Sequence, residues 1–114
     1  MNFDDVLELK KTIEIIKGEI ENRGLKIFKI ILFGSRAKGE AKEDSDWDFF
    51  IVINEEIDFK TKKEILSSIY KKLVEELNDD FEIVITSLRK FNEAKNVVGT
   101  LSYEVEKDGM LVWE

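Results

Sequence analysis

Two short segments of the sequence combine residue types that could bind phosphate and a metal ion. The first is Gly-Ser-Arg-Ala-Lys-Gly at residues 34–39, and the second is Ser-Asp-Trp-Asp at residues 45–48. Gly34 allows the backbone to turn sharply and to approach a ligand closely. A glycine-containing turn with exposed N–H groups, flanked by the positive charges of Arg36 and Lys38, is suited to phosphate.

Asp46 and Asp48 indicate a cation site beside this turn. They lie two positions apart at the start of an expected strand, so both side chains leave the same face. Their Cα atoms would be about 6.5 Å apart, a span that one or two Mg²⁺ ions could bridge. The alternative is a solvated turn capped by Ser45, but paired carboxylates beside a phosphate loop repel unless a cation lies between them. Three other acidic residues are interpreted as solubilising charges: Glu40, Glu43 and Asp44.

The hydrophobic pattern predicts the elements that position these segments. We expect an amphipathic helix capped by Asn2 and stopped by Gly24, then a buried strand at 27–33, a loop from Gly34 to Ser45 and a strand at 47–53. A helix from Asp58 to about Asn78 and a strand at 81–86 should follow. The rest of the chain should form a helix opened by Ser87, helical turns around Leu101 and Val105 that end at Gly109, and a short edge strand at 110–113. This order predicts a sheet covered by helices, an α/β or α+β fold.

The composition narrows the chemistry further. The 114 residues include 25 acidic and 18 basic ones, for a net charge of −7, and neither Cys nor His. Catalysis would therefore depend on carboxylates, Lys, Arg, hydroxyls and bound metal. The negative charge argues against broad binding of nucleic acid, which needs a basic surface. The length indicates one domain, residues 1–114.

We expect a cytoplasmic location and no contact with membranes. Residues 1–11 are acidic and amphipathic, without the layout of a signal peptide. The longest apolar stretches, such as residues 49–53, are too short to cross a bilayer.

Taken together, residues 34–39 and 45–49 resemble the signature of the DNA polymerase β-like nucleotidyltransferase superfamily. They are most similar to its small stand-alone branch, the minimal nucleotidyltransferases of the MNT–HEPN toxin–antitoxin systems. The third strand and residues 98–113 also look like that branch, so the likeness covers most of the chain. The resemblance implies the nucleotidyltransferase fold, a small mixed sheet flanked by helices.

The resemblance also implies how the nucleotide phosphates are held. Gly34 and Ser35 would bind the β- and γ-phosphates of ATP, assisted by Arg36 and Lys38. Lys38 stands where the family more often has Arg, which keeps the charge but loses a bidentate fork.

Three carboxylates would form the catalytic centre by the same resemblance. Asp46 and Asp48 would bind two catalytic Mg²⁺ ions. Glu82 occupies the place of the third carboxylate, where it would help to hold metal and could accept the proton of the attacking hydroxyl. The family usually has Asp there, which is one methylene shorter, and Asp80 is a nearby substitute if the strand register differs.

The resemblance implies transfer of AMP from ATP to a tyrosine of a cognate HEPN toxin, which would make the chain an antitoxin. Larger relatives carry a helical domain that helps to bind the acceptor. Because 114 residues cannot supply one, the acceptor surface would come from a second copy or a different protein. The alternative is a binding module that neutralises its partner by complex formation alone. Transfer to a small molecule ranks last, because its pocket would need a second domain.

Overall fold

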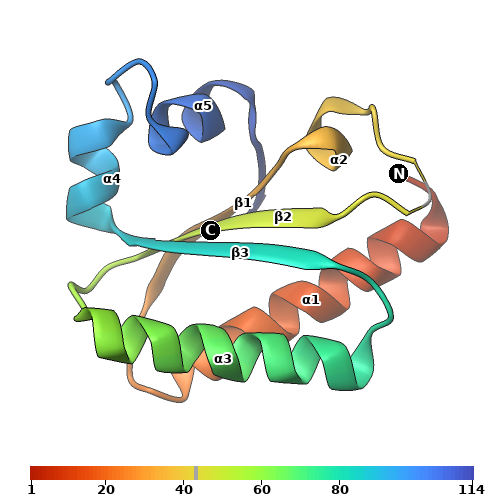
Figure 1. Cartoon of the computed structure of the whole chain (residues 1–114), viewed down its shortest axis with the longest axis horizontal. Helices are drawn as coiled ribbons and strands as arrows, with labels where there is room; N and C mark the ends of the chain where they lie inside the picture. Colours follow the sequence, from red (N-terminus) through yellow and green to blue (C-terminus); the bar gives the residue numbers. More distant parts are fainter. Residues whose placement is uncertain (43) are drawn as a thin grey trace.

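The computed structural model describes residues 1–42 and 44–114, which form one four-stranded sheet with helices on both faces (Figure 1). In chain order the elements are α1 (Phe3–Glu21), β1 (Ile27–Phe33), α2 (Ser35–Lys38), β2 (Trp47–Ile53), α3 (Phe59–Glu76), β3 (Phe81–Ser87), α4 (Leu88–Ala94), α5 (Leu101–Asp108) and β4 (Met110–Trp113). The predicted α/β fold with a small sheet flanked by helices is confirmed. Glu43, interpreted above as a solubilising charge, lies outside the described residues.

The sheet is mixed, and its strand order brings three strand ends to one edge. The order is β3-β2-β1-β4, with β1 antiparallel to both of its neighbours and β2 parallel to β3. The end of β1 therefore lies beside the beginnings of β2 and β3. This edge contains the segments that the sequence analysis singled out.

Alternation along β2 separates the two layers of the core. Its odd-numbered residues, from Trp47 to Ile53, pack against buried residues of α1 and α3 such as Ile16 and Ile69. The even-numbered Phe50 and Val52 pack on the other side with Phe91 of α4 and Val105 of α5. Because side chains alternate along a strand, Asp48 belongs to the α4 and α5 side, while Trp47 points into the α1 and α3 layer.

Side-chain caps begin the helices where the sequence indicated. Asn2 accepts a hydrogen bond from the Asp5 N–H at 2.8 Å, and Ser87 accepts one from the Lys90 N–H at 3.2 Å. Asp58 caps α3 through the N–H of Thr61 at 2.7 Å. Such caps satisfy N–H groups that have no partner within the first turn.

The expected loop from Gly34 to Ser45 is wrong in one respect, because residues 35–38 form the helical turn α2. Gly34 and Gly39 bracket this turn with φ angles of +74° and +73°. A helix of four residues is too short to produce a hydrophobic period, which is why the pattern did not reveal it. Among the described helices, none has the length and apolar character needed to span a membrane.

Candidate active site

Asp48 and Glu82 lie side by side at the sheet edge. They are directly paired in the parallel register of β2 and β3, and Phe33 at the end of β1 pairs with Asp48 from the other side. Tyr70 of α3 accepts the Ile83 N–H at 2.8 Å, which holds β3 next to Glu82. The strand register therefore places Glu82 next to Asp48, one of the two predicted aspartates Asp46 and Asp48.

Asp46 completes the group, since its charge acts on Asp48 together with that of Glu82. Asp46 and Glu82 are exposed and Asp48 is half-buried, so the group is open to solvent. Asp80, the substitute considered from the sequence, contributes its backbone instead. Its carbonyl accepts the Trp47 N–H at 2.9 Å and joins the beginnings of β2 and β3.

Crowding of these carboxylates changes the acidity of Asp48. Burial raises its pKa from 3.8 to about 6, and the charge of Glu82, a hydrogen bond with Glu82 and the charge of Asp46 act in the same direction. Close carboxylates favour either a bound proton or a bound cation.

The donor set fits Mg²⁺, which prefers carboxylate and phosphate oxygens. Across residues 1–42 and 44–114, no three side chains are already arranged as a metal-binding group. Asp46, Asp48 and Glu82 would therefore have to close around an ion, with phosphate oxygens of the nucleotide supplying further ligands.

Gly34 is required by the position of Asp48. Its φ of +74° is a conformation that glycine adopts without strain, and an added Cβ would be 2.1 Å from Asp48 Oδ2. Gly34 also has no side chain with which to cap α2. The N–H groups at the start of α2, beginning with that of the half-buried Ser35, therefore come directly after the residue that contacts the Asp48 carboxylate.

The side chain of Arg36, which was predicted to assist phosphate binding, contacts other groups of the protein. Its side chain is buried, and Nε and Nη2 donate to the Ser45 carbonyl at 3.1 and 2.7 Å. Nη1 is 3.6 Å from Asp5 of α1, and the guanidinium stacks over the Trp47 ring, 4.1 Å from its centroid. The structure therefore gives Arg36 a different task, bracing the segment immediately before Asp46. Lys38 is exposed at the end of α2, where it lines a cavity against α5.

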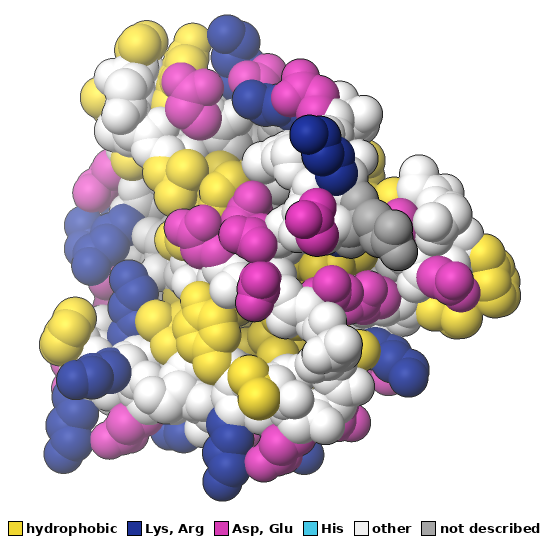
Figure 2. Space-filling model, turned by 45° about the vertical axis from the view of Figure 1, so that its right-hand side comes forward, with side chains coloured by type: hydrophobic (Ala, Val, Ile, Leu, Met, Phe, Trp, Pro, Cys, Tyr) yellow, Lys and Arg dark blue, Asp and Glu magenta, His cyan; other side chains and the backbone are white. Residues whose placement is uncertain are grey.

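Sequence reasoning missed an acidic contact near this brace. Glu8 of α1 meets Asp79, which precedes β3, and its pKa is raised to about 7 by burial and then by the hydrogen bond and charge of Asp79. The two residues are far apart in the sequence, and neither lies in a recognisable motif. Figure 2, which turns the edge where β2 and β3 begin toward the viewer, shows acidic side chains gathered across this face, with Lys and Arg mainly around it.

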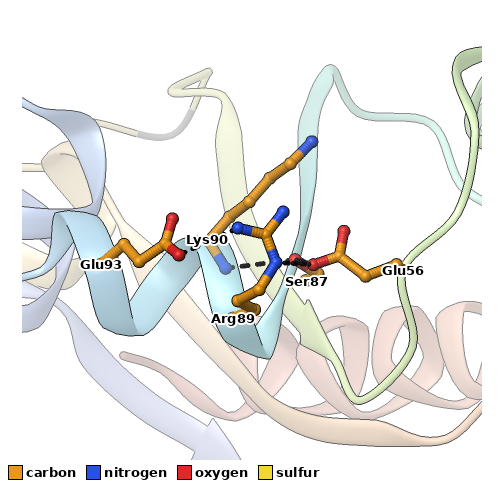
Figure 3. Close-up of polar contacts among 5 residues, drawn as sticks. All are labelled: Glu56, Ser87, Arg89, Lys90 and Glu93. Atoms are coloured by element: carbon orange, nitrogen blue, oxygen red, sulfur yellow. Dashed lines mark hydrogen bonds and ion pairs between the residues drawn. The ribbon is translucent and has the colours of Figure 1, made fainter.

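A separate polar cluster lies at the opposite end of β2 and β3. Arg89 of α4 donates to Glu56 and to Glu93, and Ser87 also donates to Glu56 (Figure 3). The hydrogen bond from Arg89 is the main reason why the pKa of Glu56 is lowered. The charged members of this cluster are exposed, and together with the buried Ser87 they fasten α4 to the β2–α3 connection, away from the carboxylates.

The fold agrees with one known protein family. The family described as polymerase beta, nucleotidyltransferase matches residues 10–114, and the chain belongs to this family. Among solved structures it is similar to one described as the crystal structure of a toxin–antitoxin with AMP-PNP, with a TM-score of 0.53 and 23% sequence identity over 91% of this chain and 71% of that chain. At this identity the likeness supports the fold. Comparison with curated protein sequences gives no match.

Proposed function

We propose that this chain is a Mg²⁺-dependent nucleotidyltransferase that transfers AMP from ATP to a tyrosine hydroxyl of a cognate HEPN toxin and thereby acts as its antitoxin. The observation that carries the proposal is the direct pairing of Asp48 with Glu82, with Asp46 beside them and Gly34 against Asp48. Phosphate and metal chemistry would thus meet at a single sheet edge. The proposed location is the cytoplasm.

Five of the predicted residues have a task in this reaction. Gly34 and Ser35 bind the β- and γ-phosphates, and the carboxylates of Asp46, Asp48 and Glu82 hold Mg²⁺. When bound, Mg²⁺ neutralises phosphate charge and stabilises the leaving pyrophosphate. Positioning and charge stabilisation of this kind suit a chain without His.

The transfer itself exchanges one bond to phosphorus for another. The acceptor oxygen forms a bond to the α-phosphorus, the bond from that phosphorus to the bridging oxygen breaks, and pyrophosphate leaves with the electron pair. The proton of the hydroxyl passes to Glu82, which is exposed at the edge strand β3 and accessible to an acceptor.

The acceptor comes from another chain in this proposal. The carboxylates open directly to solvent on an acidic face (Figure 2), which fits a protein acceptor better than a nucleic acid. The similar solved structure is a toxin–antitoxin bound to AMP-PNP, which supports a nucleotide and a partner protein for this chain too. A complex with the toxin, or with a second copy, would complete the site.

One observation favours the alternative of neutralisation by binding alone. Within the described residues the carboxylates are not yet arranged as a metal group, and Glu82 is longer than the usual Asp. In this alternative, the chain would neutralise its partner by forming a complex with it, without transferring nucleotide.

Intact-mass spectrometry of the partner protein separates the two functions. The co-purified partner protein is incubated with this chain, Mg²⁺ and ATP. Catalysis predicts a gain of whole AMP units, mapped by peptide analysis to tyrosine, which disappears with Asp46→Asn but not with the neighbouring Asp44→Asn. An unchanged partner mass in a stable, neutralised complex would support the binding module instead.

A further inference from the structure

A small cavity lies between the end of β1, the turn α2 and the helix α5. Its volume is about 220 Å³, and its lining includes Phe33, Lys38, Leu101, Glu104, Val105 and Asp108. Cavities that enclose whole drug-sized ligands begin at about 300 Å³, so this one fits part of a nucleotide. We propose that it receives the nucleobase of the substrate, and that its carboxylates select a base with an exocyclic amino group. This inference rests on the proposed function.

The cavity adjoins the candidate catalytic group. Gly34 forms part of its wall, and Gly34 also contacts the Asp48 carboxylate so closely that a Cβ would be 2.1 Å from Oδ2. Phe33, another wall residue, is the direct strand partner of Asp48. A nucleotide whose phosphates lie along Gly34 and Ser35 would therefore have this cavity within reach of its other end.

The walls combine a flat apolar surface with hydrogen-bond acceptors. Phe33, Leu101 and Val105 supply the apolar surface, which suits an aromatic base. Glu104 and Asp108 form no ion pair within the described part of the chain, so their oxygens remain available as acceptors. Carboxylates repel phosphate but accept hydrogen bonds from an amino group. Adenine has such a group, whereas uracil has none.

Helix α5 is fixed in place, so the cavity is formed before any ligand binds. Thr100 caps the helix by accepting a hydrogen bond from the Tyr103 N–H at 3.1 Å, and its hydroxyl lies 2.8 Å from the Ala94 and Val97 carbonyls, to which it can donate its one proton. At the other end, a Cβ added to Gly109 would be 2.4 Å from a methyl carbon of Ile31. A preformed cavity avoids the entropic cost of ordering a flexible wall.

Binding of nucleotide in the absence of any acceptor protein tests the proposal without relying on activity. The probes are AMP-PNP and inorganic tripolyphosphate, each titrated calorimetrically with Mg²⁺. Leu101→Trp fills the cavity from a residue that is 42% exposed, so the fold should tolerate it. The matched control is Leu111→Trp, at a comparably exposed leucine of β4 that does not line the cavity.

We expect Leu101→Trp to weaken AMP-PNP binding by about tenfold or more while tripolyphosphate binding stays unchanged. In wild type, ATP should outcompete UTP, and the double variant Glu104→Gln with Asp108→Asn should reduce that preference. The 2′-deoxy form of ATP should bind like ATP, because the base rather than the ribose enters the cavity. A preference for ATP over its deoxy form that the double variant removes would overturn the assignment to the base.

Unchanged AMP-PNP affinity in Leu101→Trp, with normal thermal unfolding, would overturn the cavity assignment and leave the proposed function standing. Failure of the wild type to bind either probe with Mg²⁺ would overturn both. The two failures are therefore distinguishable.

Discussion

The carboxylate of Asp48 lies against the α-carbon of Gly34, so closely that a Cβ at Gly34 would be 2.1 Å from Oδ2. The residue that opens the proposed phosphate-binding turn therefore also limits where the carboxylate of Asp48, a proposed metal ligand, can lie. The two halves of the motif depend on each other because β1 and β2 are antiparallel neighbours, so that the end of β1 lies beside the beginning of β2. A change in either half should disturb both.

Gly34→Ala tests whether the position of the Asp48 carboxylate depends on the absence of a side chain at Gly34. Gly34 has φ +74° and ψ −157°, a region of backbone conformation that is essentially restricted to glycine, so an Ala there costs about 1–3 kcal/mol. Its Cβ would also push Asp48 away. We expect lower stability together with weaker Mg²⁺-dependent binding of AMP-PNP. Gly18→Ala is the matched control, since Gly18 lies inside α1 with no atom within 4 Å of an added Cβ. It should raise stability by about 0.5–1 kcal/mol and leave binding unchanged; equal binding by both variants would contradict the account.

Asp48→Asn should change how stability depends on pH. The pKa of Asp48 is about 6 in the folded chain against 3.8 ordinarily, so between these values the folded state holds a proton that the unfolded state has lost. Stability then falls as pH rises from about 4 to about 6, and the ionised carboxylate stays unfavourable above that range. Thermal unfolding in EDTA should show Asp48→Asn more stable than wild type at pH 7.5, with the difference shrinking toward pH 4. A difference independent of pH would contradict this cause.

Glu8→Gln should remove a similar penalty at higher pH. Burial and Asp79 raise the pKa of Glu8 from 4.5 to about 7. As for Asp48, the folded state holds a proton that the unfolded state has lost, so the free energy of unfolding of wild type should decline as pH rises from about 4.5 to about 7. This contribution to the decline should be absent from the variant. Unfolding of Glu14→Gln, an exposed position on the same helix, provides the control. Parallel pH profiles for wild type and Glu8→Gln would refute the predicted coupling.

Arg36→Lys should weaken the brace before Asp46 while keeping the charge. Lysine cannot make the two hydrogen bonds that Arg36 donates to the Ser45 carbonyl. We expect a loss of about 1–3 kcal/mol in unfolding free energy and a higher Mg²⁺ requirement for AMP-PNP binding. Arg89→Lys alters an exposed arginine at the far end of the sheet (Figure 3) and should change neither. A stability loss in Arg36→Lys without any change in Mg²⁺ requirement would limit Arg36 to supporting the fold.

Local signals in the sequence predicted most of the fold. The caps at Asn2, Asp58 and Ser87 fixed the beginnings of helices, because each cap is made within three residues. The apolar stretch at 47–53 predicted β2 with its observed bounds. These features depend on short stretches of chain, which is why pattern and propensity suffice for them.

Features set by distant contacts could not be predicted in this way. The resemblance pointed to Glu82 as the third carboxylate, with Asp80 as the substitute if the strand register differed. The pairing of Glu82 with Asp48 depends on the parallel register of β2 and β3, which local signals do not set. Arg36 had the charge for phosphate, but its partners, Ser45 and Asp5, come from a loop and from α1. The contact of Glu8 with Asp79 likewise joins elements far apart in the chain. Such relationships follow from tertiary packing rather than from local sequence.

The most direct test of the central claim is the partner's mass after incubation with Glu82→Gln and Glu82→Asp variants, Mg²⁺ and ATP. Glu82→Gln removes the charge paired with Asp48, and Glu82→Asp keeps it with the length usual in the family. The account predicts AMP transfer by wild type and Glu82→Asp, and none by Glu82→Gln despite an intact complex. Transfer by Glu82→Gln at the wild-type rate would contradict it, because the carboxylate beside Asp48 would then have no part in the reaction.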